Sequence, residues 1–200
     1  MTLDRFRPLA DSALDPFVRA AVRLGLSPDA VSIIAFVLAI GAAGGFYLAT
    51  PAGYVAGALL VFFNGWLDLV DGSLARELAV DSPAGDLLDH VLDRYADVII
   101  VGGLAAGIDQ YALGFLAVTG VLLTSYMGTQ TEAVGLTREY GGLLGRADRL
   151  ALIGLTGFVM AFVPRIGGMT LVAWLLVLFT VVGHVTAFQR FWGAWRDLSS

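Results

Sequence analysis

The sequence predicts an all-α membrane protein with six transmembrane helices, preceded by an amphipathic helix in the membrane interface. Hydrophobic residues make up 58% of the 200 residues and charged residues only 14%, too few to cover a water-soluble protein of this size. Mean hydropathy is +0.79. Apolar segments long enough, or nearly so, for a bilayer crossing of about 20 residues recur along the chain. We therefore expect one membrane domain over residues 1–200.

The elements follow from the pattern of apolar residues. Residues 3–24 place apolar side chains at roughly helical spacing between arginines and aspartates, which is typical of an amphipathic interfacial helix. Ser27 and Pro28 then start the first span, because proline is favoured at the first positions of a helix. The bundle of residues 31–190 contains predicted spans at 31–50, 52–67, 87–107, 111–131, 150–163 and 169–188.

The distribution of arginines predicts the orientation. The basic residues number twelve, and all of them are arginines. With six spans, all but Arg165 fall on the side of the two termini. Because arginine accumulates in cytoplasmic loops, we expect both termini, and any site beside them, on the cytoplasmic side of the cell membrane.

Charge and cysteine content exclude several function classes. The net charge of −5 argues against a nucleic-acid partner. The chain has no cysteine, which excludes a thiolate nucleophile and a cysteine-ligated zinc site.

Four aspartates mark the boundary between the second and third predicted spans. Asp68 and Asp71 are three residues apart, and Asp89 and Asp93 are four apart, so each pair shares one helix face. Consecutive antiparallel helices would bring these carboxylates together at the cytoplasmic boundary. Ionisable groups at membrane depth are costly and usually functional, and a divalent cation would relieve their repulsion. Oxygen-only ligands favour Mg²⁺ or Mn²⁺, and such ions suit phosphate chemistry.

The aspartates and their neighbours together resemble the signature of the CDP-alcohol phosphotransferase family. Every signature position is present at the expected spacing: Asp68-x2-Asp71-Gly72-x2-Ala75-Arg76-x8-Gly85-x3-Asp89-x3-Asp93. The six-span layout and the interfacial helix are also similar to this family, so the resemblance covers essentially the whole chain.

The resemblance implies a phospholipid-synthesising enzyme. It would transfer a diacylglycerol-phosphate or archaeol-phosphate group from CDP-diacylglycerol or CDP-archaeol to a polar alcohol and release CMP. Asp68, Asp71 and Asp89 would hold two divalent ions, Mg²⁺ or Mn²⁺, with Asp93 touching the second ion. Asp93 would also be the general base that deprotonates the acceptor hydroxyl. The family likeness further implies a homodimer.

The resemblance also implies where the CDP-lipid binds. The pocket would be formed by Asp29, Ser32, Gly72, Ala75, Arg76, Ser82 and Gly85. Asp29 and Ser32 match an element that the family carries at the start of its first span. The alternative interpretation of Pro28 and Asp29 is an ordinary helix start.

Three arginines, Arg138, Arg146 and Arg149, follow the fourth predicted span. Cytoplasmic charge bias alone could place them there, but guanidinium groups also bind phosphate through two parallel hydrogen bonds. The functional interpretation is a pocket for a phosphorylated alcohol.

The identity of that alcohol stays open in the sequence. The segment from Arg146 to Arg149 resembles the inositol-phosphate-using branch of the family. That branch typically ends its fourth span with Lys/Arg-x-Arg-x-Glu, where this chain has Gly128, Gln130 and Glu132. Two expected cations are missing, so inositol phosphate and glycerol phosphate are both open, and serine explains the arginines less well.

Two other function classes use similar residues. A membrane prenyltransferase also combines aspartate pairs with Mg²⁺, but it would be expected to have more spans and two separate aspartate-rich motifs. A cation transporter would place acidic residues along the depth of the membrane, whereas these lie at one boundary.

Two further expectations concern packing. We expect Asp97 to pair with a nearby arginine. We also expect Gly103-x3-Gly107 to permit a close helix contact, which would favour a dimer.

Overall fold

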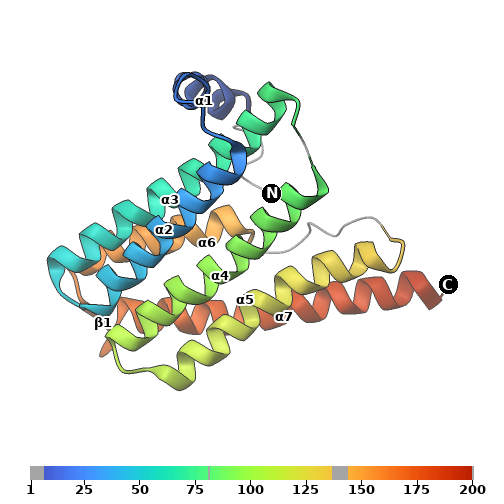
Figure 1. Cartoon of the computed structure of the whole chain (residues 1–200). Helices are drawn as coiled ribbons and strands as arrows, with labels where there is room; N and C mark the ends of the chain where they lie inside the picture. The colour runs from blue at the N-terminus through green and yellow to red at the C-terminus, as the bar shows by residue number, and fades with distance from the viewer. Residues whose placement is uncertain (1–6, 81, 137–143, 200) are drawn as a thin grey trace.

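The computed structural model describes residues 7–80, 82–136 and 144–199, and within these ranges the chain is almost entirely helical. The elements in chain order are α1 (Arg7–Arg23), α2 (Pro28–Tyr47), α3 (Pro51–Leu78), α4 (Pro83–Gly107), α5 (Tyr111–Ala133), α6 (Arg146–Met160), β1 (Arg165–Ile166), β2 (Met169–Thr170) and α7 (Leu171–Ser199). The prediction of an all-α protein is confirmed, apart from a hairpin of two two-residue strands that joins α6 to α7 (Figure 1).

The starts of α2, α3 and α4 share one local signal. Each helix has proline at its first position and a hydroxyl residue just before it, and the hydroxyl oxygen accepts a hydrogen bond from a backbone N–H in the first turn. The caps and donors are Ser27 with Ala30 at 3.2 Å, Thr50 with Gly53 at 3.0 Å, and Ser82 with Gly85 at 3.0 Å. The starts of α3 and α4 fix the register of the two helices that carry the four aspartates.

Among the described helices, α2, α3, α5 and α7 are long and apolar enough to cross a membrane. The helix α4 carries Asp93, Arg94 and Asp97 near its middle. The helix α6 has only 15 residues, about 22 Å at 1.5 Å per residue, against a hydrocarbon core of about 30 Å. Length and composition therefore support a membrane protein with four candidate spans.

The helix that contains the second predicted span, 52–67, extends beyond the apolar part of that span. The helix α3 continues through the aspartates and ends at Leu78, followed by Ala79 in the left-handed conformation with φ of 51°. The apolar run ends where the acidic residues begin, but the helical hydrogen bonding does not. The extra turns carry Asp68 and Asp71 on a rigid element.

The helices form two packed groups that meet at α4 and α6. The helix α2 packs against both α3 and α4, while α5 packs along α7 (Figure 1). The side chain of Asn64 on α3 donates to the carbonyl of Ala35 on α2 at 2.9 Å. Buried Leu14, Val18 and Ala21 of α1 pack with Val70 and Leu74 of α3.

The glycine pair expected at a dimer contact, Gly103 and Gly107, instead packs against α2 of the same chain. A Cβ atom on Gly103 would overlap the backbone of Ala43, and one on Gly107 would overlap the backbone of Phe46. Both glycines therefore permit the close approach of α4 to α2, so this pair no longer supports a dimer.

Candidate active site

The acidic residues of α3 and α4 converge although the two helices do not pack directly side by side. Both helices pack on α2, which lies between them. One carboxylate oxygen each from Asp68, Asp71 and Asp89 lies within 4.8 Å of the others. Asp71 is buried, and the other two are partly buried. Helical spacing therefore assembles three of the four predicted metal ligands.

These side chains line a small cavity, which we call the acidic cavity, with a volume of about 10 Å³. Asp93 also lines it but is not in the group of three converging carboxylates. Arg146 of α6 reaches into this cavity, with 2.5 Å from its Nη1 to Asp68 Oδ2 and 2.6 Å from its Nη2 to Asp93 Oδ1. One guanidinium from α6 thus bridges α3, which carries Asp68, and α4, which carries Asp93.

The donor set of the acidic cavity fits a hard divalent cation. The three converging ligands offer only carboxylate oxygens, which Mg²⁺ and Mn²⁺ prefer. Asp68, Asp71 and Asp89 are the residues that would hold such an ion.

Ser32 lies against one of these ligands. Its hydroxyl donates to Asp71 Oδ2 at 2.7 Å in a buried hydrogen bond. The side chain predicted to contact nucleotide thus orients a carboxylate of the acidic cavity in this structure. Sequence spacing gave no sign of this contact, because the two residues are 39 positions apart.

The remaining residues predicted to bind the CDP-lipid form two groups. Asp29, Ser82 and Gly85 meet where α2 and α4 begin, because a Cβ atom on Gly85 would lie 3.2 Å from both Asp29 Oδ1 and Ser82 Oγ. Gly72, Ala75 and Arg76 lie together near the end of α3. Arg76 is exposed and donates to Ser73 Oγ at 3.0 Å.

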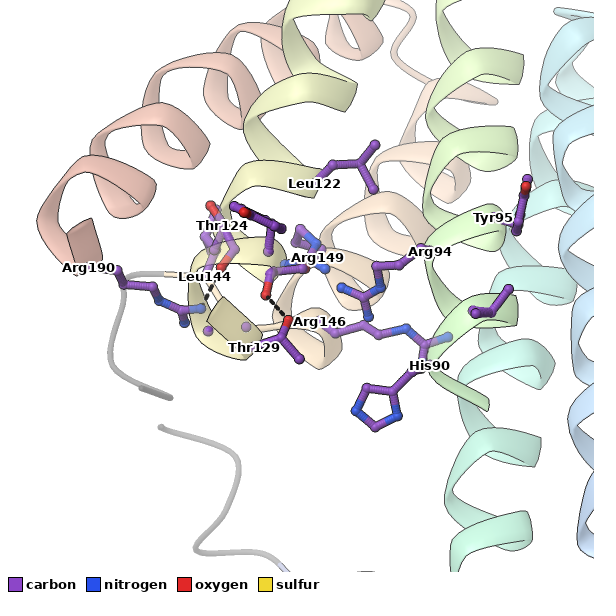
Figure 2. A pocket seen from close by; sticks show the side chains of 15 residues that line it. His90, Arg94, Tyr95, Leu122, Thr124, Thr129, Leu144, Arg146, Arg149 and Arg190 are labelled. Atoms are coloured by element: carbon purple, nitrogen blue, oxygen red, sulfur yellow. Dashed lines mark hydrogen bonds between the residues drawn. The ribbon is translucent and has the colours of Figure 1, made fainter. Parts of the chain in front are cut away.

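A second cavity, the basic cavity, has a volume of about 510 Å³ and is lined from α4, α5, α6 and α7 (Figure 2). Four arginines line it: Arg94, Arg146, Arg149 and Arg190. Arg146 and Arg149 were predicted to bind the acceptor, while Arg138 lies outside the described residues. Arg94 and Arg190 were missed, because neither belongs to a motif and each comes from a different helix.

Contacts with neighbouring helices hold two of these arginines in place. Arg149 Nη2 lies 2.9 Å from Asp97 Oδ2, which confirms the expected arginine partner of Asp97. Arg190 Nη1 donates to the carbonyl of Thr124 at 2.6 Å, from α7 to α5 (Figure 2). The buried Nε atoms of Arg94, Arg146 and Arg149 have no hydrogen-bond partner among the described residues. Four positively charged guanidinium groups around one cavity indicate a site for an anion.

A third cavity, the apolar cavity, has a volume of about 640 Å³ and lies between α3 and α6. Leu59, Phe62, Leu155 and Phe158 line it and are each at least half exposed at the surface of the bundle. Arg146 lines this cavity, the acidic cavity and the basic cavity. The three cavities therefore meet at one guanidinium.

Known proteins share this arrangement of sequence and fold. The archaetidylinositol phosphate synthase of Methanothermobacter thermautotrophicus is 29% identical over 98% of this chain and 95% of its own length. The phosphatidylinositol phosphate synthase of Mycobacterium tuberculosis, solved with CDP-DAG bound, superposes with a TM-score of 0.78 at 27% identity, covering 91% of this chain and 93% of that chain.

The same mycobacterial enzyme, solved with manganese and citrate, also has a TM-score of 0.78 at 27% identity, with 91% and 88% of the two chains covered. The CDP-alcohol phosphatidyltransferase family profile matches residues 25–185. That range includes all eight positions of the aspartate signature, so the chain belongs to the CDP-alcohol phosphatidyltransferase family.

Proposed function

We propose that this transferase moves a lipid phosphate group from a CDP-activated lipid to inositol phosphate and releases CMP. The observation that carries the proposal is the basic cavity, which is lined by four arginines and by several hydroxyl-bearing residues. Two relatives that match this chain over 95% and 93% of their own lengths are synthases of inositol-phosphate lipids.

The basic cavity supports a phosphorylated polyol in particular. Guanidinium groups bind phosphate, and hydroxyl groups of Thr124, Ser125, Tyr126 and Thr129 line the same space. Gly128, where the inositol-phosphate branch has a cation, also lines the cavity. Arg94 from α4 and Arg190 from α7 supply positive charge there instead, so the missing motif is no argument against inositol phosphate.

The transfer step follows from the position of Asp93 between the cavities. Asp93 lines the acidic and apolar cavities and contacts Arg146, which also lines the basic cavity. Its carboxylate would take the proton of the acceptor hydroxyl. The freed oxygen forms a bond to the lipid-linked phosphorus, the bond from that phosphorus to the CMP oxygen breaks, and CMP leaves. A divalent ion at Asp68, Asp71 and Asp89 would offset the charge of the diphosphate.

The apolar cavity suits the lipid part of the donor. Its walls on α3 and α6 are hydrocarbon, and its polar end carries Asp68 and Arg146. A lipid with its diphosphate at that end would have its chains along the outer face of the bundle.

The remaining proposals concern assembly in the membrane. We place α4 and α6 across the bilayer with the four longer helices, which gives six spans. Arg165 in β1 lies at the end of the bundle away from α1, whereas the arginines of the basic cavity lie near the start of α6 (Figure 1). Positive charge thus favours a cytoplasmic site and cytoplasmic termini. Two ions of Mg²⁺ or Mn²⁺ and a homodimer stay predictions from the family.

The test is CMP release by the purified protein with Mg²⁺. Inositol 1-phosphate, glycerol 3-phosphate and serine are each supplied with CDP-diacylglycerol and, separately, with CDP-archaeol. We expect release that depends on inositol 1-phosphate with one of the donors, and none from the Asp93→Asn variant. Release that depends on glycerol 3-phosphate would overturn the acceptor, and release with no acceptor would point to hydrolysis instead of transfer.

A further inference from the structure

Asn64 is a buried polar residue that the proposed reaction leaves without a role. It is 1% exposed and lies on α3, one turn before Asp68. Its side chain lines the acidic cavity together with the four signature aspartates. We infer that the amide oxygen of Asn64 belongs to the divalent-cation site and supplies it with a neutral oxygen donor. This inference rests on the metal site of the proposed function.

The orientation of the amide is fixed by its neighbour on α2. The Nδ2 atom of Asn64 donates to the carbonyl oxygen of Ala35 at 2.9 Å. A carbonyl oxygen accepts hydrogen bonds and cannot donate them, so the nitrogen and not the oxygen must face Ala35. The Oδ1 atom therefore points away from that bond, and it is buried without a hydrogen-bond partner among the described residues.

The groups around the acidic cavity do not satisfy this oxygen. With a divalent cation bound, the aspartates would be ionised, and ionised carboxylates only accept hydrogen bonds, so they could not donate to it. The hydroxyl of Ser32 donates to Asp71, and the terminal nitrogens of Arg146 contact Asp68 and Asp93. A buried acceptor left unpaired is unfavourable, which makes a cation or its bound water the partner that the cavity chemistry calls for.

The size and register of the cavity agree with this assignment. Its volume of about 10 Å³ admits about one water-sized sphere, which excludes a larger polar ligand at this depth. Asn64, Asp68 and Asp71 are spaced as i, i+4 and i+7, so they follow one stripe of α3. Asn64 extends the ligand stripe by one turn without adding negative charge, and amide oxygens are ordinary ligands of hard divalent cations.

The test measures Mn²⁺ affinity directly, by electron paramagnetic resonance of free Mn²⁺ titrated into the purified full-length protein. Asn64→Leu removes the oxygen at similar volume, and Asn64→Asp keeps an oxygen at the same place. We expect Asn64→Leu to raise the Kd for Mn²⁺ on the order of 10-fold, and Asn64→Asp to keep wild-type affinity or exceed it. Thr131→Val is the matched control, because Thr131 is also a buried polar residue and lines none of the three cavities.

Two other results of this titration would contradict the inference. Equal affinities of wild type and Asn64→Leu would overturn it. Equal losses in both variants would assign the effect to the bond from Nδ2 to Ala35 and would also overturn it. If Asn64→Leu does not fold, Asn64→Ala takes its place in the same comparisons. Absence of Mn²⁺ binding by wild type would overturn the metal site itself, whereas a different acceptor would leave Mn²⁺ binding intact.

Discussion

The acidic and basic cavities lie side by side but are built in opposite ways. The acidic cavity takes its four carboxylates from α3 and α4, which follow one another in the chain. The basic cavity takes its arginines from α4, α6 and α7, with most of its hydroxyl groups on α5. A site on two consecutive helices is visible as residue spacing, whereas a site gathered from distant helices is visible only in three dimensions.

The two cavities also differ in how their charge is balanced. Arg146 places one cation among the four aspartates, with contacts to Asp68 and Asp93. Asp97 places one anion beside the arginines, 2.9 Å from Arg149 and 3.8 Å from Arg94. Arg146 belongs to both cavities, so substitutions should separate into those that affect one substrate and those that affect both.

The largest effect is expected from Asp93→Asn. The amide cannot accept the hydroxyl proton, so the rate of CMP release should fall by on the order of 10²- to 10⁴-fold. The affinity for Mn²⁺ should change little, because Asp68, Asp71 and Asp89 remain. The rate is measured under saturating donor and acceptor.

The matched control for this variant is Asp86→Asn, which removes a carboxylate from the exposed first turn of the same helix. Its rate should stay close to that of wild type. Wild-type turnover by Asp93→Asn would remove Asp93 from the role of base.

An intermediate effect should distinguish Arg190 from Arg146. Arg190→Gln should raise KM for the acceptor on the order of 10- to 100-fold, because hydrogen bonds to charged groups contribute about 1.5–3 kcal/mol, and should leave KM for the CDP-lipid unchanged. Arg146→Gln should raise both KM values, since Arg146 also lines the apolar and acidic cavities. Initial rates with each substrate varied in turn give the two constants.

Arg196→Gln serves as the control, because Arg196 lies on the same helix as Arg190 and its side chain is 78% exposed. Both KM values should be those of wild type. If Arg146→Gln raised KM for the acceptor alone, Arg146 would act only in the basic cavity. Its contact with Asp68 would then have no part in binding the CDP-lipid.

The smallest effect is expected at Ser82, which caps α4 and is also predicted to contact the CDP-lipid. Ser82→Ala removes the cap of α4 and should lower stability by about 1 kcal/mol, seen as a lower midpoint of thermal unfolding. Ser82→Asp restores a capping oxygen and should restore the midpoint. If Ser82 also contacts the CDP-lipid, KM for the donor stays raised in Ser82→Asp. A wild-type KM in both variants would limit Ser82 to its structural role.

Sequence reasoning reached the fold class and the acidic cavity because both depend on local periodicity. The apolar composition predicted membrane helices, and spacings of three and four residues placed Asp68, Asp71 and Asp89 together. Hydropathy could not place the end of α3 at Leu78, because it follows the surroundings of a residue and not its backbone hydrogen bonds. Arg190 was missed because its place depends on how α7 packs against α5.

The acidic and basic cavities are lined by partly different helices, and this has an evolutionary consequence. The residues of α5 and α7 that line the basic cavity do not line the acidic cavity. If they bind the acceptor as proposed, acceptor preference can change there while the transfer chemistry is preserved. Gly128 and Gln130 already differ from the usual inositol-phosphate pattern, in line with such change. Position 146 has no such freedom, because any replacement must suit three cavities at once. Lineages of this family that change acceptor should therefore diversify α5 and α7 long before they alter this arginine.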